Sequence, residues 1–316
     1  MTRPDPAPLL SQEDLLALLS RLGPEWAPPD FLDAVARDPQ AGVYTRPENL
    51  ALKFTLRSCQ PPFSEPFAFG RIAAAQALGG LYAAGARPVA ALALLDLPEP
   101  DIPSHMLLAL KAGISHCCQD TGVALAGIHV QVTPTLSCGL LALGQINPRN
   151  LAHGSLPRLG DRLILGKPLG QGLYQAARAR GELHPQDLQE WMALAAQPNS
   201  PGPALDCLDG VHQILEVGRQ GLLGALQELE QAGTSLRLEV AAIPTMTRVR
   251  DLLNGLELRQ QAQSLLRDPQ FNGGLAVICS GETVTEVLSI FLQQGFIHAS
   301  VIGQVVPAGP ERLLLA

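Results

Sequence analysis

The sequence has no long apolar run, no block of like charges and no cysteine motif of the metal-binding kind. Its longest apolar stretches, such as Val89 to Leu95 and Leu313 to Ala316, are far shorter than the roughly 20 residues of a membrane-spanning helix. The 22 basic residues are scattered, and the formal net charge is −7. We therefore expect no membrane span and no nucleic-acid partner. Residues 1–10 also lack the pattern of a signal peptide, which predicts a cytoplasmic protein.

The six cysteines show no CxxC spacing and no histidine at metal-ligand intervals. This pattern predicts reduced, mostly buried thiols. Cys117 and Cys118 are adjacent, near His116, but neighbouring residues on a helix point about 100° apart. We therefore assign no metal or redox role to that pair.

The chain has the composition and length of a folded, two-domain protein. Hydrophobic residues make up 47% and charged residues 16% of its 316 residues, and a chain of this length normally divides into more than one core. Polar residues, prolines and glycines interrupt the pattern at 147–160. We expect a divergent N-terminal extension at 1–40, an N-terminal domain at 41–155 and a C-terminal domain at 156–316.

Strands and helices alternate along the chain, which is typical of an α/β or α+β fold. Periodicity predicts strands at 49–57, 89–95, 123–132, 138–146, 162–166, 236–240, 275–279 and 298–305, and helices at 11–22, 69–84, 104–118, 212–231, 249–255 and 283–294. Small residues cover the 69–84 helix, so another backbone can approach it closely. Gly85 suits a left-handed cap after that helix, and Ser104 is predicted to cap the next one.

Five stretches carry a resemblance to a known family. They are FAFGRIAAAQALGGLYAAG at 67–85, AGIH at 126–129 with the strand after it, LILGKPLGQGL at 163–173, LLGAL at 222–226 and DPQFNGGL at 268–275. In their order and spacing, from about residue 41 to the C-terminus, they resemble the selenophosphate synthetase branch of the aminoimidazole ribonucleotide synthetase superfamily.

The resemblance implies a fold, a ligand and a partner. It implies an N-terminal domain whose strands form a barrel with those of a second subunit, and a C-terminal α/β domain packed against it. Active members of the family bind ATP between the domains and convert ATP and selenide into selenophosphate, AMP and phosphate. That chemistry uses carboxylates to place magnesium on the polyphosphate, because unshielded phosphate oxygens repel an incoming nucleophile.

Most residues that the family uses for this chemistry are missing. Nothing in residues 1–38 matches the glycine-rich loop that carries a Cys or selenocysteine and a Lys. A metal-binding carboxylate of the family corresponds to Gln40, the Asp of a Thr-Asp pair to Arg57, and an Asp on the following helix to Gly80. A magnesium ion beside an uncompensated guanidinium is strongly disfavoured.

Further family positions have also changed. On the helix that carries Gly80, the family's Asn corresponds to Gln76. Near His129, the family's Asp and Glu correspond to Val132 and Thr135. Of the family's carboxylates, only the one that corresponds to Glu216 keeps its negative charge. We therefore assign no metal-binding residue and doubt a role for magnesium.

The remaining candidates for a nucleotide-binding or anion-binding site are Arg57, Arg71, His129, Lys167, Glu216 and Asp268. We expect Arg57 to contact any bound anion, with Lys167 or His129 on the facing wall. Structural roles are the alternative for these residues: Arg71 could tie its helix to a loop carbonyl, and Lys167 could be a solvated side chain. Arg57 could point outward or pair with Glu65 or Glu48, and the Asp268-Pro269-Gln270 turn could serve only the fold.

Three functions follow from these observations. The first is a pseudoenzyme that keeps the fold to bind a partner or a small ligand. The second is an active ATP-dependent phosphotransferase, similar to selenide, water dikinase, with altered metal or substrate use. The third is a dimeric regulatory module that pairs with a true family enzyme. ATP is the candidate ligand, and a homodimer is expected because unpaired strand edges are normally covered.

Overall fold

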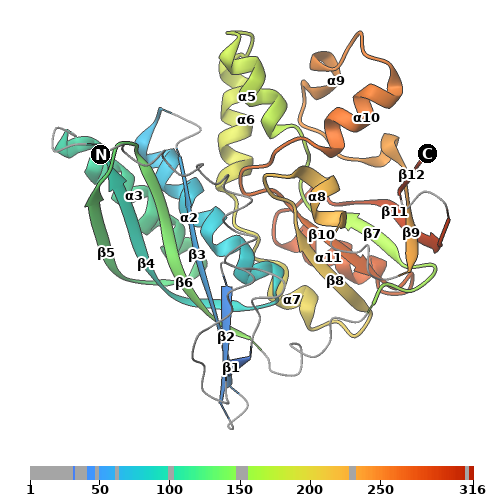
Figure 1. Ribbon diagram of the computed structural model, residues 1–316, viewed down its shortest axis with the longest axis horizontal. Coiled ribbons are helices and arrows are strands. Elements are labelled where there is room, and N and C mark those ends of the chain that lie inside the picture. The colour runs from blue at the N-terminus through green and yellow to red at the C-terminus, as the bar shows by residue number, and fades with distance from the viewer. Residues whose placement is uncertain are drawn as a thin grey trace, which may run out of the picture.

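The computed structural model of the protein describes residues 31–32, 41–46, 50–60, 64–98, 103–146, 156–227, 233–309 and 313–316, with side chains from residue 51 onward. The helix predicted at 11–22 and the candidate residue Gln40 lie outside these ranges. Within them, the chain forms two sheets, each covered by helices (Figure 1). The predicted alternation of strands and helices in a mixed α/β fold is confirmed.

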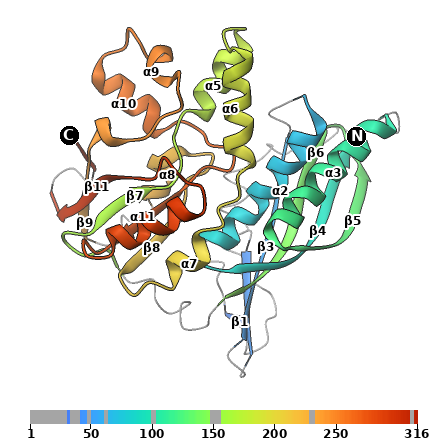
Figure 2. The same ribbon diagram turned by 180° about the vertical axis from the view of Figure 1, so that it is seen from behind.

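The first sheet, sheet A, has six strands in the order β1-β2-β3-β6-β4-β5 and is open. Only β4 and β5 are parallel neighbours. Helices α2 and α3 pack on one face of it and lie in front of the sheet in Figure 2. The elements of this N-terminal unit are β1 (Phe31–Leu32), β2 (Ala41–Arg46), β3 (Leu50–Cys59), α2 (Pro66–Ala83), β4 (Arg87–Leu97), α3 (Ser104–Thr121), β5 (Ala124–Val132) and β6 (Ser137–Ile146).

Glycines bring α2 and α3 into backbone contact. A Cβ added at Gly70 would lie 2.2 Å from the carbonyl oxygen of Leu110, and one added at Gly113 would lie 2.0 Å from that of Phe67. The close approach predicted for this small-residue helix is therefore confirmed. Gly85 has φ +68°, as predicted for a left-handed cap. The cap predicted at Ser104 is wrong, because α3 begins at that residue and no side chain caps it.

The second sheet, sheet B, has the strand order β12-β9-β11-β7-β10-β8. Its neighbours are antiparallel except for β12 and β9. The elements of this C-terminal unit are β7 (Arg162–Leu165), α5 (Gln171–Ala179), α6 (Pro185–Ala196), α7 (Gly202–Asp206), β8 (Val211–Glu216), α8 (Gly221–Gln227), β9 (Thr234–Leu238), η3 (Val240–Ala242), α9 (Val249–Leu252), α10 (Leu258–Leu266), β10 (Leu275–Cys279), α11 (Val284–Gln293), β11 (Ser300–Pro307) and β12 (Leu313–Leu315).

One predicted element of this unit is wrong. The helix expected at 212–231 is strand β8 followed by the short helix α8. Strand β8 pairs along β10, with Leu215 opposite Ala276 and Ile214 opposite Val277. A short apolar run fits a buried strand as well as a helix, and pairing with a strand about 60 residues later decides between them.

Helix α2 belongs to both units. Ile72 is fully buried in the hydrophobic core of the C-terminal unit, whereas Ala74 and Leu78 belong to the core under sheet A. At the other end of α2, a Cβ added at Gly202 of α7 would lie 2.0 Å from the carbonyl oxygen of Tyr82. The two units therefore meet along this helix.

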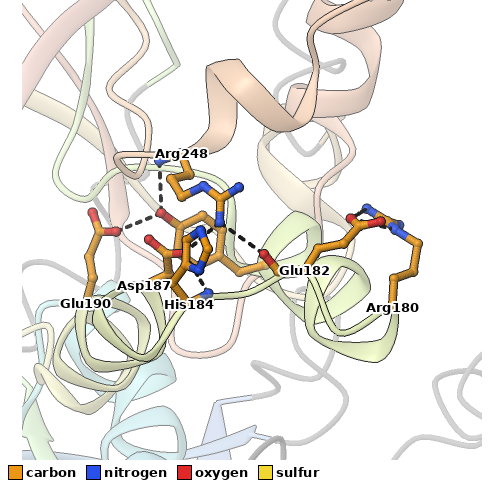
Figure 3. A network of polar contacts seen from close by, with 7 residues as sticks. Arg180, Glu182, His184, Asp187, Glu190 and Arg248 are labelled. Atoms are coloured by element: carbon orange, nitrogen blue, oxygen red, sulfur yellow. Dashed lines mark hydrogen bonds and ion pairs between the residues drawn. The ribbon is translucent and has the colours of Figure 1, made fainter.

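A polar network stiffens the outer part of the C-terminal unit (Figure 3). The Arg248 guanidinium, just before α9, donates to the Asp187 carboxylate of α6 at 2.9 Å and to the Glu182 carbonyl at 3.0 Å. The Tyr174 hydroxyl of α5 donates to Glu190 at 2.7 Å and accepts from the Arg248 backbone at 3.0 Å. These contacts tie α5 and α6 to the segment before α9.

Candidate functional site

An ion pair joins the two units where α2 passes between them. Arg57 lies near the end of β3, and Glu216 is the last residue of β8. The Arg57 Nη1 atom lies 2.5 Å from the Glu216 Oε2 atom, and the side chains are 25% and 13% exposed. This is a charge-assisted contact in a place where water screens it only partly.

Two adjacent glycines of α2 make room for that pair. A Cβ added at Gly79 would lie 2.3 Å from the Glu216 Oε1 atom, and one added at Gly80 would lie 3.0 Å from the Arg57 Nη2 atom. Arg57, Gly80 and Glu216, the three positions predicted from the sequence to correspond to family carboxylates, thus come together in space. The missing side chain at Gly80 provides the space that the guanidinium fills.

Of the two partners considered for Arg57 from the sequence, Glu65 has another role and Glu48 lies outside the described residues. The carboxylate of Glu65 caps α2 instead, with its Oε1 atom 3.1 Å from the backbone nitrogen of Phe67. A pairing with Glu48 therefore stays a prediction. Among the described residues, the structure shows Glu216 as a partner of Arg57, 159 residues away in the sequence.

Lys167 is fully buried rather than exposed in a binding wall. Its ammonium donates to the carbonyl oxygens of Gln197 at 2.6 Å and Asn272 at 2.9 Å, and it lies 5.8 Å from the centre of the Phe296 ring. Burial lowers the pKa of Lys167 to about 7, and the charge of Glu216 acts in the opposite direction. The amine of Lys167 is thus hydrogen-bonded to backbone carbonyls and can lose its proton near neutral pH.

Residues that hold Lys167 in place were missed in the sequence. Asn272 has φ +50°, and its amide donates to the carbonyls of Ala195 and Gln197, each at 2.7 Å. Asn199 donates to the carbonyl of Gly273 at 2.8 Å. The Asn-Gly pair at 272–273 is a turn signal that could have indicated the left-handed residue.

Asp268 serves the start of α5. Its carboxylate accepts from the backbone nitrogens of Gly172 at 3.2 Å and Leu173 at 2.7 Å, and from the Gln270 amide at 2.6 Å. Burial raises the pKa of Asp268 to about 6, against the effect of these hydrogen bonds. The Asp268-Pro269-Gln270 turn therefore has a structural task.

Arg71 and His129 lie apart from the ion pair. The Arg71 guanidinium of α2 contacts the Asp120 carboxylate of α3 at 3.1 Å, and Asp120 also contacts His116. His129 is exposed on β5, the edge strand of sheet A, opposite Leu94. The structure thus gathers Arg57, Glu216 and Lys167 at the junction, and leaves Arg71, His129 and Asp268 elsewhere.

The side chains at this junction do not suit a magnesium ion. Magnesium prefers several oxygen ligands in an octahedral arrangement. Here the Glu216 carboxylate already faces a guanidinium, and Gly80 has no side chain. Val132, also predicted to replace a family carboxylate, is an exposed apolar residue on the edge strand β5. In the part of the chain that the structure describes, no three His, Cys, Asp or Glu side chains are grouped so as to hold a metal ion. Nor does any helix in these ranges have the length and apolarity to cross a membrane.

Both halves of the chain match models of known protein families. Residues 39–146 match the family described as AIR synthase related protein, N-terminal domain, and residues 158–315 match AIR synthase related protein, C-terminal domain. The chain therefore belongs to the AIR synthase related protein family.

Its sequence relatives narrow this to one branch. The chain is 38% identical over 306 residues to a selenide, water dikinase from Dechloromonas aromatica, with 90% of this chain and 88% of the relative covered. It is 36% identical over 314 residues to a selenide, water dikinase from Burkholderia pseudomallei, with 92% and 89% covered. The predicted membership of the selenophosphate synthetase branch is confirmed.

Solved structures share the fold at lower sequence identity. A thiamine-monophosphate kinase from Stenotrophomonas maltophilia superposes with a TM-score of 0.70 at 19% identity, covering 96% of this chain and 94% of that one. The hydrogenase maturation protein HypE superposes with a TM-score of 0.70 at 21% identity, covering 94% and 92%. The fold is therefore that of the AIR synthase related proteins.

Proposed function

We propose that this chain is a pseudoenzyme of the selenophosphate synthetase branch, which keeps the fold but does not form selenophosphate from ATP and selenide at the rate of its relatives. The observation that supports this most directly is the Arg57–Glu216 ion pair. The one carboxylate kept at these family positions is neutralised inside the protein. It has little charge left to offer a divalent cation.

A metal ion could bind Glu216 only if Arg57 moved away. A guanidinium that stayed beside the metal ion would repel it, because both are positively charged. Gly79 and Gly80 fit the pair closely, so the arrangement is built into α2 as well as into the two charged residues. The proposal therefore rests on four residues from three elements.

The direct test is selenide-dependent AMP formation from ATP and magnesium. The selenide, water dikinase of Dechloromonas aromatica, assayed in parallel, is the positive control. We expect AMP from the control and none above the blank from this chain. Selenide-dependent AMP from this chain at a rate comparable to the control would overturn the proposal.

The alternative function is an active phosphotransferase in which Arg57 binds a phosphate of ATP, and it predicts a different binding result. Calorimetry with ATP, with and without magnesium, separates the cases. If Arg57 holds a phosphate, ATP binds equally well without magnesium, and Arg57→Ala weakens binding at least about tenfold, because a charge-assisted hydrogen bond contributes roughly 1.5 to 3 kcal/mol. We expect no magnesium-dependent binding in the wild type, and Arg57→Asp does not restore it.

We also propose that the chain forms a homodimer through the face of sheet A opposite to α2 and α3. Strand register places Leu56, Leu141 and Leu92 in one row across β3, β6 and β4, and each is at least 36% exposed. Phe54 extends this apolar row and is 38% exposed. A contiguous apolar face of this kind is a candidate protein interface.

Sedimentation tests the dimer. We expect a dimer at micromolar concentration and a monomer for Leu141→Lys, because a charge in the centre of the apolar face opposes its burial. Leu258→Lys is the matched control, since Leu258 is 83% exposed and lies in the C-terminal unit. A wild-type monomer, or a dimer that Leu141→Lys leaves intact, would contradict the proposed interface. Mixed sedimentation with a true family enzyme tests the regulatory alternative.

A further inference from the structure

Two thiols face each other at one end of sheet A. Cys59 is the last residue of β3, and Cys138 lies directly opposite it on the antiparallel strand β6. Residues opposite each other in such a pair project from the same face of the sheet. Cys138 belongs to the core between the sheet and its helices, and Cys59 packs against the same core. Both are free thiols in this structure.

This placement meets the distance requirement of a disulfide. Directly opposed residues of antiparallel strands have Cα atoms about 4.5 to 5.5 Å apart. The Cα atoms of disulfide-bonded cysteines lie about 4.4 to 6.8 Å apart. The two backbones thus need not separate or approach for a bond to form between the sulfurs.

No other pair among the six cysteines is placed in this way. Cys117 and Cys118 follow one another in α3, and Cys279 stands opposite Arg162 and Val211 in sheet B. Cys207 is exposed after α7. Cys59 and Cys138 are therefore the one cross-strand pair, and the reduced state expected from the sequence is only one of the states open to them.

The surroundings of the two thiols differ. Cys138 is fully buried, whereas Cys59 is partly exposed. Cys59 also lies close enough to Arg219, in the C-terminal unit, to interact electrostatically with it. Burial raises the pKa of both thiols, each of Cys59 and Asp96 raises that of Cys138 further, and Arg219 acts in the opposite direction on Cys59. A reagent that comes from solvent reaches Cys59 first.

We propose that Cys59 and Cys138 form a reversible intramolecular disulfide when the protein meets a hydroperoxide. The Cys59 sulfur, after passing its proton to solvent, attacks one oxygen of hydrogen peroxide, which breaks the O–O bond and gives a sulfenic acid and, with that proton, water. The Cys138 sulfur then attacks the Cys59 sulfur and displaces its hydroxyl, which leaves as water with the Cys138 proton. In sum, two thiols and one peroxide give one disulfide and two waters.

The disulfide would act on the junction of the two units. Arg57 is two residues before Cys59, on the same face of β3, and contacts Glu216. A bond to β6 fixes the end of β3 and keeps the Cys59 sulfur turned toward Cys138 rather than toward Arg219. The inference does not depend on the pseudoenzyme proposal, because it rests on strand register and on the exposure of Cys59.

Peptide mapping tests the disulfide. The full chain is treated with hydrogen peroxide, its remaining thiols are alkylated after unfolding, and its peptides are measured by mass spectrometry with and without reduction. We expect a linked Cys59–Cys138 peptide that reduction releases, in the wild type and in Cys207→Ser, and none in Cys59→Ser. The oxidised wild type should unfold several degrees higher than the reduced protein, because a long loop is closed, and Cys59→Ser should show no such shift.

Other results would overturn the inference. These are sulfinic or sulfonic acid at Cys59 with Cys138 still free to be alkylated, a link from either residue to Cys207, or no peroxide-dependent change at either thiol. Cys59→Ser decides the matter even if replacement of the fully buried Cys138 prevents folding, since Cys59 lies at a strand end and is partly exposed.

Discussion

Removal of either partner of the Arg57–Glu216 pair should destabilise the protein, and removal of both should cost less than the sum. Exposed ion pairs contribute roughly 0.2 to 1 kcal/mol, whereas loss of one partner from a buried pair costs roughly 3 to 5 kcal/mol. With side chains 25% and 13% exposed, this pair lies between these limits. We expect about 2 kcal/mol for Arg57→Met or Glu216→Gln alone, because each leaves a charge or an amide poorly solvated.

The double variant isolates the interaction. In a double-mutant cycle we expect a coupling free energy of about 1 to 2 kcal/mol, measured by urea unfolding. The coupling should depend weakly on salt, because the pair is largely screened from solvent by protein. Arg180 and Glu182 form the matched control: their contact is 2.8 Å, but the side chains are 54% and 49% exposed. The same cycle there should be additive.

Two results would refute this reasoning. Additive effects at Arg57 and Glu216 would mean that the contact contributes nothing beyond what water offers. A coupling that disappears in high salt would mean that the pair is exposed in solution. In either case the argument that Glu216 is neutralised inside the protein would lose its physical basis.

Three further predictions concern buried groups. The free energy of unfolding of wild type relative to Lys167→Met should rise by a few kcal/mol from pH 7 to pH 10. In this range the unfolded lysine holds a proton that the folded lysine, with a pKa of about 7, has lost. A difference that does not change with pH would contradict the burial of the amine. The free energy of unfolding of wild type relative to Asp268→Asn should fall by a few kcal/mol between pH 4 and pH 7. The folded pKa of Asp268, about 6, lies above the unfolded value, so the carboxyl stabilises the fold fully at low pH and stops doing so as it ionises. Urea unfolding at a series of pH values measures the effects at Lys167 and Asp268. Gly113→Ala should lower the stability by about 3 kcal/mol or prevent folding, because its Cβ would lie 2.0 Å from a backbone oxygen that cannot rotate away. Gly181→Ala is the control: its Cβ would have nothing within 4 Å, so only the smaller cost of a positive φ remains.

Several features of the fold followed from local patterns. The strand predicted at 275–279 is β10, and the helix predicted at 69–84 is α2, which starts three residues earlier and ends one residue earlier. These segments have strong periodicity, and their ends are marked by glycine or proline. The ordered motifs also identified the family, because a motif is read from consecutive residues and needs no knowledge of distant partners.

The sequence could not decide how the candidate residues are combined. It proposed Arg57, Lys167 and Glu216 as candidates, but not that Glu216, 159 residues away and on another sheet, pairs with Arg57. Likewise, Lys167 is not a solvated side chain, because the 268–274 loop and the residues after α6 close over it.

By itself, then, the sequence determined the family and the alternation of strands and helices, since both follow from local composition and spacing, and it predicted the loss of acidic residues. Only the tertiary structure decided that Gly80 accommodates Arg57, that β8 is a strand, and that Cys59 stands opposite Cys138. The physical reason is the same in all three cases. Each depends on a contact between segments far apart in the chain, and such contacts arise from packing and strand register, which the local preference of any one segment does not specify.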